Sequence, residues 1–204
     1  MTVVLVTGFE PFGGAARNPS GDAAKRLHGT ELAGHRVHGV ELPCTFAGAG
    51  RALHAAIDAV RPVLVLGLGL AASRSGFWPE RVAINLIDAR IPDNAGAQPV
   101  DVPVLVGGAP AHFTTLPVKA MAAALQVAGH AAGLSHSAGT FVCNQVFYLT
   151  MQALVRRPGV RGGFIHLGGD LDTADVVRGV EVALGFALVT VGDLRDTGGS
   201  IDCA

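Results

Sequence analysis

The sequence predicts an α/β fold, a three-layer α/β/α sandwich around a mostly parallel, twisted sheet. Along the 204 residues, β-rich apolar runs alternate with alanine-rich runs of helical periodicity. The run at 63–68 has no polar side chain, as expected for a strand that helices cover on both faces. No repeat, low-complexity segment or linker interrupts this alternation. We therefore expect one domain over residues 1–204, with 192–204 as a loose tail.

The first elements are read from apolar runs and from a helix start signal. Residues 2–7 are a short apolar run with no basic residue before it, which is typical of a first core strand and not of a signal peptide. Asn18 followed by Pro19 predicts a helix over 19–27, because asparagine caps a first turn and proline is tolerated there. Residues 36–42 are the next β-rich run.

The middle of the chain alternates in the same way and then becomes irregular. Residues 50–60 carry their apolar side chains on one stripe, which predicts a helix. Strands are expected at 63–68 and at 81–89, the second of them followed by turn residues at 91–96. Residues 98–116 hold several prolines and glycines with little periodicity, so we expect loop and short irregular strands there.

The last part of the chain returns to helices and strands. Apolar periodicity bounded by stop signals predicts helices at 117–131, 144–156 and 173–184. Short apolar runs predict strands at 134–138, 163–167 and 187–191. The resulting alternation of strand and helix is the pattern of a sheet with helices on both faces.

Composition argues against several classes of function. Half of the residues are hydrophobic, 15% are charged and the formal net charge is −1, without a lysine or arginine run. Nucleic acid and anionic membranes are therefore not expected partners. The longest apolar stretch, 63–72, is well short of the roughly 20 residues that a membrane span needs. Three widely spaced cysteines, with no CxxC or HxxxH pair, fit free thiols in a reducing cytoplasm and argue against a metal site.

Cys143 is the main candidate for a chemical role. It lies where an expected strand, a glycine-containing turn and a helix meet. Free N–H groups and the dipole at a helix start favour a thiolate, and the same N–H groups can stabilise an oxyanion. The alternative is a packing role, because free cysteine is among the most buried residue types. Cys44, after a proline, and Cys203, in the expected tail, are expected to be structural or incidental.

His166 and Glu80 are the candidates for activating that thiol. His166 ends an apolar strand, and chemistry in open parallel sheets collects at the carboxyl ends of strands. The alternative is a histidine that only bonds a backbone carbonyl. Glu80 precedes an expected strand, where it completes the triad by orienting the histidine. The alternatives are that it is solvated or that it forms an ion pair with Arg81 or Arg90. A thiol, a base and an orienting acid are the parts of a nucleophilic triad.

The glycine-rich loop at 7–14 follows the first expected strand. A phosphate-binding loop needs small residues and a lysine, whereas this loop carries Phe9 and Phe12 and has no lysine. Nucleotide binding is therefore disfavoured. The two phenylalanines are expected either to line a small apolar pocket or to belong to the core.

Six motifs occur in a fixed order along the chain. They read TGFEPFGG at 7–14, PERVAIN at 79–85, DARIPDN at 88–94, TLP at 115–117, AGTFVCN at 138–144 and GGFIH at 162–166. With them, the chain resembles the pyroglutamyl peptidase I (pyrrolidone-carboxylate peptidase) family of cytosolic cysteine peptidases over roughly residues 2 to 190. Several motifs in order are more specific than any single glycine pattern.

The resemblance implies that the protein hydrolyses the N-terminal pyroglutamyl residue from peptides through a thioester, without a cofactor. It implies Cys143 as the nucleophile, His166 as the base and acid, and Glu80 as the residue that orients His166. The side chains that it places around the lactam ring are Phe9, Phe12, Ile91, Phe141 and Val142. It places Arg90 and the Cys143 backbone N–H near the oxyanion. The family is generally oligomeric, so a homo-oligomer (dimer or tetramer) is also implied, with 98–117 as a candidate interface.

Three departures from the family pattern lie near the expected site. Leu70 stands where the family often has glutamine, and Trp78 where it usually has threonine. The loop after His166 lacks the usual proline, and the connection to the last helix is shorter. These changes leave open a degenerate member that binds pyroglutamyl groups with little turnover. A related α/β/α hydrolase or a nucleoside phosphorylase-like enzyme is a further alternative on fold class alone, but it leaves Cys143 without a role.

Overall fold

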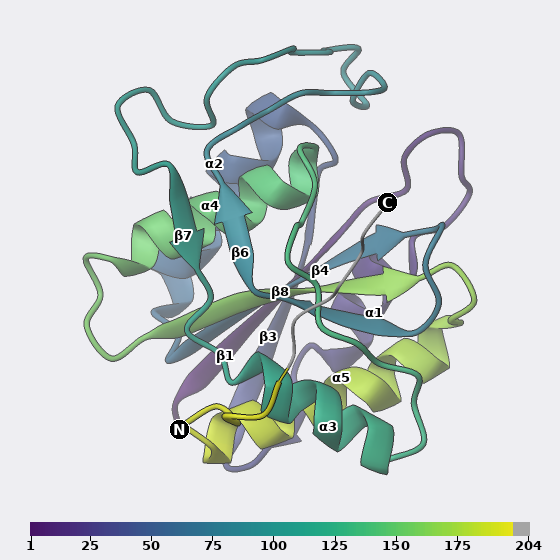
Figure 1. Cartoon of the computed structure of the whole chain (residues 1–204), viewed down its shortest axis with the longest axis vertical. Coiled ribbons are helices and arrows are strands. Elements are labelled where there is room, and N and C mark those ends of the chain that lie inside the picture. Colours follow the sequence, from purple (N-terminus) through teal and green to yellow (C-terminus); the bar gives the residue numbers. More distant parts are fainter. Residues whose placement is uncertain (198–204) are drawn as a thin grey trace.

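The computed structural model describes residues 1–197, and Cys203 lies outside them. The helices are α1 (Pro19–Leu27), α2 (Phe46–Val60), α3 (Val118–Val127), α4 (Val142–Leu154) and α5 (Thr173–Val189). The strands are β1 (Val3–Phe9), β2 (Glu31–Leu32), β3 (His35–Leu42), β4 (Leu64–Ala71), β5 (Phe77–Glu80), β6 (Val82–Ile84), β7 (Ala111–Phe113) and β8 (Arg161–Gly168). The predicted α/β/α fold with a mostly parallel sheet is confirmed (Figure 1).

The central sheet has the strand order β2-β3-β1-β4-β8-β5. Its four inner strands, β3, β1, β4 and β8, are parallel to one another. The two edge strands, β2 and β5, are antiparallel to their neighbours. The carboxyl ends of β1, β4 and β8 therefore meet at one edge of the sheet, where open α/β sheets carry their sites.

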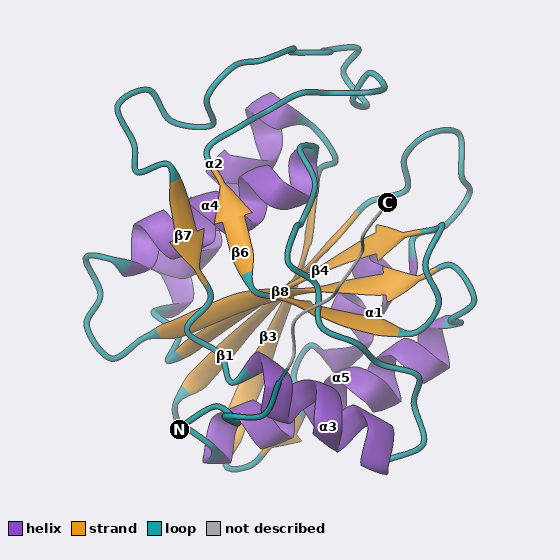
Figure 2. Cartoon of the chain, in the orientation of Figure 1, coloured by secondary structure: helices purple, strands orange, loops and turns teal. Residues whose placement is uncertain are grey.

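Helices cover both faces of this sheet (Figure 2). On one side, α1, α3 and α5 pack against Val4, Val6 and Leu66. On the other side, α2 and α4 pack against Leu5 and Val65. Neighbouring residues of one strand point to opposite faces, and here both faces are buried. This explains why β1 and β4 read as continuous apolar runs instead of alternating ones.

The strand expected at 81–89 is confirmed only over residues 82–84, where β6 forms. β6 pairs with β7 in a separate two-stranded sheet, whereas β5, directly before it, forms the edge of the central sheet. The side chain of Asn144 takes the place of a neighbouring strand: it accepts from Ile84 N at 3.0 Å and donates to Ile84 O and Leu86 O. Further along, Ile87 forms an isolated antiparallel bridge with Val102, and Ala89 N donates to Pro99 O. The segment after β6 is thus bonded partly by an amide side chain and partly by the irregular backbone at 99–110.

Two other expected strands are wrong. Residues 134–138 make only a single bridge to the sheet, between Ser135 and Glu80. They run beside β5 as an irregular edge. Residues 187–191 lie mostly in α5, which continues to Val189 because its buried face extends at helical spacing through Leu184 and Ala187.

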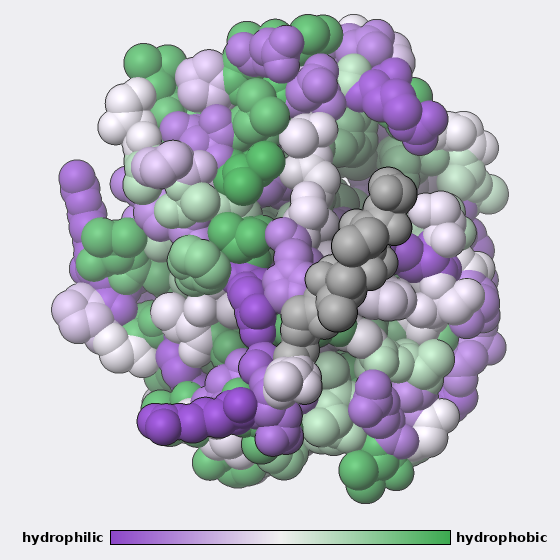
Figure 3. All heavy atoms as spheres, viewed as in Figure 1, coloured by the Kyte–Doolittle hydropathy of each residue, from purple (hydrophilic) through white to green (hydrophobic). Residues whose placement is uncertain are grey.

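The surface seen in Figure 3 mixes polar and apolar residues. Several exposed apolar side chains belong to the irregular segment 98–117, among them Val106 (86% exposed) and Phe113 (67%). Beyond α5, the Asp193 carboxylate accepts hydrogen bonds from Lys119 N and Ala120 N and so caps α3. Among the described residues, no helix combines the length and apolar character that crossing a membrane requires.

Candidate active site

The register between β5 and β8 brings Glu80 and His166 together. Trp78 lies directly opposite His166, and Glu80 is two residues further along β5, on the same face of the sheet. His166 Nδ1 lies 2.7 Å from Glu80 Oε1. Because a carboxylate can only accept, Nδ1 carries the proton, and Nε2 is left as the ring nitrogen that can take another. The ring of Phe164, 5.0 Å away between centroids, packs against the imidazole.

Cys143 lies in the first turn of α4, directly after the turn that contains Gly139. Gly139 has a φ of 75°, in the left-handed region that favours glycine, so the chain can turn sharply into the helix. The sulfur lies against the carboxyl end of β4: a Cβ atom on Gly69 would come within 2.7 Å of Cys143 Sγ. Only glycine at 69 leaves room for the sulfur beside the sheet.

The thiol of Cys143 is neutral in this surrounding. Burial raises its pKa above the ordinary cysteine value, and the nearby Cys44 and Glu80 raise it further. A smaller effect, a hydrogen bond from its own backbone N–H, favours the thiolate. The thiol therefore needs a base to take its proton, and His166 supplies a free ring nitrogen for this.

A cavity of about 550 Å³ opens at this edge of the sheet. Cys143 and His166 both line it, whereas Glu80 is fully buried behind His166. Of the side chains expected around a lactam or oxyanion, five line the cavity: Phe9, Phe12, Arg90, Ile91 and Phe141. The placement of Val142 there is wrong, because its side chain is fully buried in the core between α4 and the sheet.

A hydrogen-bond network holds the walls of the cavity in place. Glu10 Oε1 accepts from Cys44 N at 2.9 Å and from Asn94 Nδ2 at 2.8 Å, and Asn94 Nδ2 also donates to Pro11 O. These bonds join the loop that carries Phe12 to the end of β3 and to the turn after Ile91. Asp93, nearly buried, accepts from Phe46 N and from two N–H groups of its own turn. The cavity is thus built from loops that are tied to one another.

Several residues of the site were not foreseen as site residues from the sequence. Cys44 lines the cavity, although its position after Pro43 suggested only packing. Asp88, also on the cavity wall, lies within the DARIPDN motif, which was the available signal. The cation beside Glu80 is Arg74, at 3.4 Å, and neither Arg81 nor Arg90. Nothing in the sequence separated these arginines, because the choice depends on how the β4–β5 loop folds.

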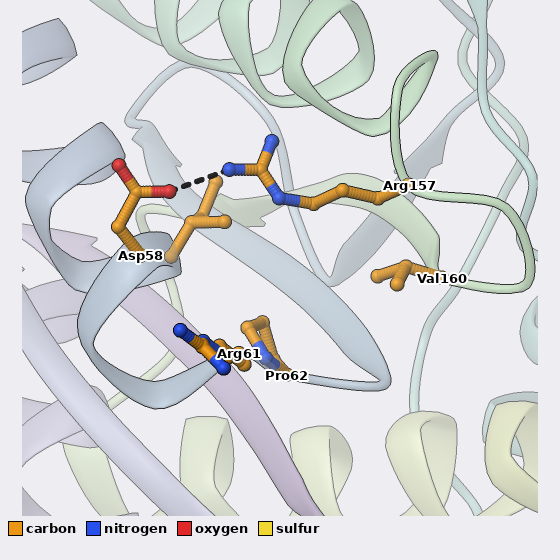
Figure 4. A pocket seen from close by; sticks show the side chains of 6 residues that line it. Asp58, Arg61, Pro62, Arg157 and Val160 are labelled. Atoms are coloured by element: carbon orange, nitrogen blue, oxygen red, sulfur yellow. Dashed lines mark hydrogen bonds and ion pairs between the residues drawn. The ribbon is translucent and has the colours of Figure 1, made fainter.

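A second cavity, of about 410 Å³, lies at the amino ends of β4 and β8 (Figure 4). Its main polar feature is an ion pair between Arg157 and Asp58, 2.5 Å apart, and pairs of this exposure contribute little to stability. It holds no cysteine or histidine. Within residues 1–197, no group of three or more histidine, cysteine, aspartate or glutamate side chains is placed to hold a metal ion. The first cavity is therefore the candidate active site.

Known proteins resemble the chain over almost its full length. A family model described as pyroglutamyl peptidase matches residues 2–169. The pyrrolidone-carboxylate peptidase of Erwinia tasmaniensis is 45% identical over 212 aligned residues, which cover 98% of this chain and 99% of that protein. The one from Escherichia fergusonii is 46% identical with the same coverage.

Solved structures that resemble this chain belong to the same family as the sequence relatives. Pyroglutamyl peptidase I from Bacillus amyloliquefaciens superposes with a TM-score of 0.93 at 37% identity, covering 96% of this chain and 99% of that one. The pyrrolidone carboxyl peptidase from Thermococcus litoralis also gives 0.93, at 32% identity, covering 97% and 100%. The family resemblance seen in the six motifs is thereby confirmed, and the chain belongs to the pyroglutamyl peptidase family.

Proposed function

We propose that this protein is a cysteine omega-peptidase that hydrolyses the N-terminal pyroglutamyl residue from peptides through a thioester at Cys143. One arrangement carries the proposal: a thiol at a helix start and a histidine held by a buried carboxylate line the same cavity. The names of its relatives, pyrrolidone-carboxylate peptidases, point to the same substrate group.

The chemistry of the cavity suits a neutral ring. Phe141 packs against Phe12 and Phe46, with ring centroids 6.3 and 5.2 Å apart. A pyroglutamyl group is compact, uncharged and partly apolar, so aromatic walls and a few backbone hydrogen bonds are enough to hold it. An ordinary peptide N-terminus carries an ammonium, which would lose its hydration in such a pocket at a large cost in free energy.

In the proposed mechanism, His166 Nε2 takes the proton of Cys143, and the sulfur attacks the carbonyl carbon that joins the ring to the next residue. The new C–S bond leaves the charge on the carbonyl oxygen, near the Cys143 backbone N–H and Arg90. The C–N bond then breaks as the imidazolium gives its proton to the departing amine. In the second half, His166 takes a proton from water, which attacks the thioester; the C–S bond breaks and the thiol regains its proton.

A comparison of two ring substrates tests this proposal. We expect the protein to release the reporter amine from a pyroglutamyl amide, and to cleave the matching prolyl amide more slowly by a factor on the order of 10³ or more, because proline carries a charged amine. The assay is the initial rate at matched concentrations. Equal rates for the two amides would contradict the proposed substrate. Binding of a pyroglutamyl compound in calorimetry without any turnover would instead favour the degenerate alternative.

We also propose that the protein is cytoplasmic and that it forms a homo-oligomer through the segment 98–117. The free thiols of Cys44 and Cys143 fit a reducing compartment.

Exposed apolar side chains such as Val106 fit a subunit contact, and stable contacts bury roughly 1,200–2,000 Å². Light scattering after gel filtration is expected to give a molar mass that is a multiple of the 20.8 kDa of one chain. The substitution V106D is expected to lower this mass. A wild-type mass of one chain at micromolar concentration would rule this out.

A further inference from the structure

The guanidinium of Arg74 lies beside the buried carboxylate of Glu80. Arg74 Nη1 is 3.4 Å from Glu80 Oε1, the same oxygen that contacts His166 Nδ1 at 2.7 Å. Glu80 is fully buried, and its other oxygen, Oε2, has no hydrogen-bond partner among the described residues. Among residues 1–197, the two groups recorded as ion-pair partners of this carboxylate are the His166 imidazole and Arg74.

A buried carboxylate in this position needs a permanent cation. Moving an unpaired carboxylate out of water costs several kcal/mol, and such a group takes up a proton unless a charge partner prevents it. His166 balances the charge only while it is protonated, yet a base must be neutral to accept a proton. Arg74 remains charged at every working pH. It can keep Glu80 anionic while His166 is neutral.

The surroundings of Arg74 fix its side chain in this place. Its guanidinium carbon lies 5.1 Å from the centre of the Trp78 ring, and Nη1 donates to Ser135 Oγ at 3.0 Å. The Trp78 ring is itself held by a hydrogen bond from Nε1 to Ser75 O at 2.8 Å. The arginine backbone is anchored as well, because Arg74 N donates to Ala71 O and Arg74 O accepts from Gly169 N. A cation that stacks on an aromatic ring and is hydrogen-bonded at its tip is held in its position in the folded protein.

We propose that Arg74 is a positioning residue of this peptidase: clamped by Trp78 and Ser135, it holds Glu80 as an anion and so keeps His166 in the tautomer that can accept the thiol proton. The proposal rests on the roles proposed above for Glu80 and His166. It gives a role to Trp78, the residue that stands in place of the usual threonine. Arg74 acts through Glu80 and does not touch the reacting atoms.

The positive charge of Arg74 determines the direction in which its removal shifts the pH profile. Activity requires the Cys143–His166–Glu80 group to lose a proton as the pH rises from acid values. A nearby cation favours that loss, so removing it makes the group hold its proton more tightly. The acid limb of the pH profile then moves to higher pH. Because about a third of the Arg74 side chain is exposed, solvent reduces the effect, and we expect a displacement of about half to one pH unit.

The test compares Arg74→Gln, Arg74→Lys and Arg81→Gln. Arg81 follows Glu80 in the chain, and its side chain lines a different cavity, beside Phe113 and Asp193, so Arg81→Gln is the matched loss of one charge. Two pH profiles are measured for each variant: kcat/KM on the pyroglutamyl amide, and the rate of Cys143 alkylation by iodoacetamide. We expect the acid limbs of both profiles to shift to higher pH in Arg74→Gln. In Arg74→Lys the shift is expected to be less than half as large, and in Arg81→Gln no shift is expected.

Two outcomes would overturn the proposal: an unchanged acid limb in Arg74→Gln, or the same displacement in Arg81→Gln. Alkylation needs no substrate, so it reports on Arg74 even if the protein does not cleave pyroglutamyl amides. Trp78→Leu and Trp78→Phe keep the arginine and change the ring that it stacks on; because Trp78 also lies opposite His166, the phenylalanine variant, which keeps an aromatic ring there, is the control. This pair replaces Arg74→Gln if that variant does not fold. The leucine variant is expected to shift the acid limb to higher pH, and the phenylalanine variant to shift it less. If neither variant shifted the acid limb, the Trp78 ring would not be what holds Arg74 beside Glu80.

Discussion

Replacing Cys143 by alanine is expected to lower kcat by a factor on the order of 10⁵ or more, since the proposed reaction has no other nucleophile. Cys143→Ser is expected to be nearly as inactive, because a hydroxyl at this position is a much weaker nucleophile than a thiol. The measurement is the rate of amine release from a pyroglutamyl amide, with thermal unfolding to show that each variant is folded. Turnover that survives in Cys143→Ala would remove the thioester from the mechanism.

Cys44 provides the matched control for this experiment. It lines the same cavity, but burial, with the charges of Glu10 and Asp93 adding to it, raises its pKa to about 12. It therefore stays a neutral thiol at working pH, and Cys44→Ser is expected to retain turnover. If the serine variant at 44 lost as much activity as the one at 143, the two sulfurs would have to share the chemistry.

The raised pKa of Cys143 also predicts a pH dependence that does not need substrate. In His166→Ala no base remains, so the thiol loses its proton only at a pH above the usual cysteine value of about 8.5. Alkylation of Cys143 in this variant is thus expected to be slow at neutral pH and to keep rising beyond the range of an exposed cysteine. The same reaction in wild-type protein is expected to be faster at neutral pH, because His166 takes the proton.

Replacing Glu80 by glutamine is expected to lower kcat by about 10³- to 10⁴-fold. The glutamine amide can donate to His166 Nδ1, which would place the ring proton on Nε2 and leave no acceptor for the thiol proton. The change also removes the charge that faces Arg74 in the buried site. The readout is kcat at saturating substrate, with KM expected to change little because Glu80 does not line the cavity.

Glu181→Gln, on the exposed side of α5, is the control for the loss of one carboxylate. It is expected to match the wild type in kcat. If Glu80→Gln raised KM and left kcat unchanged, Glu80 would belong to substrate binding and not to the orientation of His166.

Helices whose ends depend on neighbouring residues in the sequence were predicted with bounds close to those observed. Helix α1 was predicted with its observed bounds because Asn18 caps it and Pro19 opens it. Helix α2 begins at Phe46, earlier than the expected 50, because Thr45 caps it; the glycines of its first turns masked that signal. At one of them, Gly50, the helix passes close to α4: a Cβ there would lie 2.7 Å from Leu149 Cδ1, so a larger residue requires that leucine side chain to move.

Segments whose hydrogen bonds depend on distant parts of the chain were predicted poorly. The strand expected at 81–89 is limited to β6, and the backbone there bonds partners distant in sequence: the Asn144 side chain at Ile84 and the backbone of Val102 at Ile87. Val142 was placed in the pocket by its position in a motif, but the first turn of α4 points this side chain into the core. A motif identifies neighbours along the chain and does not say which of them faces the cavity.

The sequence by itself determined the fold class and the family, and it singled out Glu80, Cys143 and His166 as the candidate triad, because apolar periodicity and the motifs are local properties of the chain. Tertiary structure alone decided that β5 runs antiparallel to β8, which puts Glu80 beside His166, and that Arg74 is the cation next to them. The physical reason is that strand register and loop packing follow from the burial of the whole core. No local segment of the sequence contains that information.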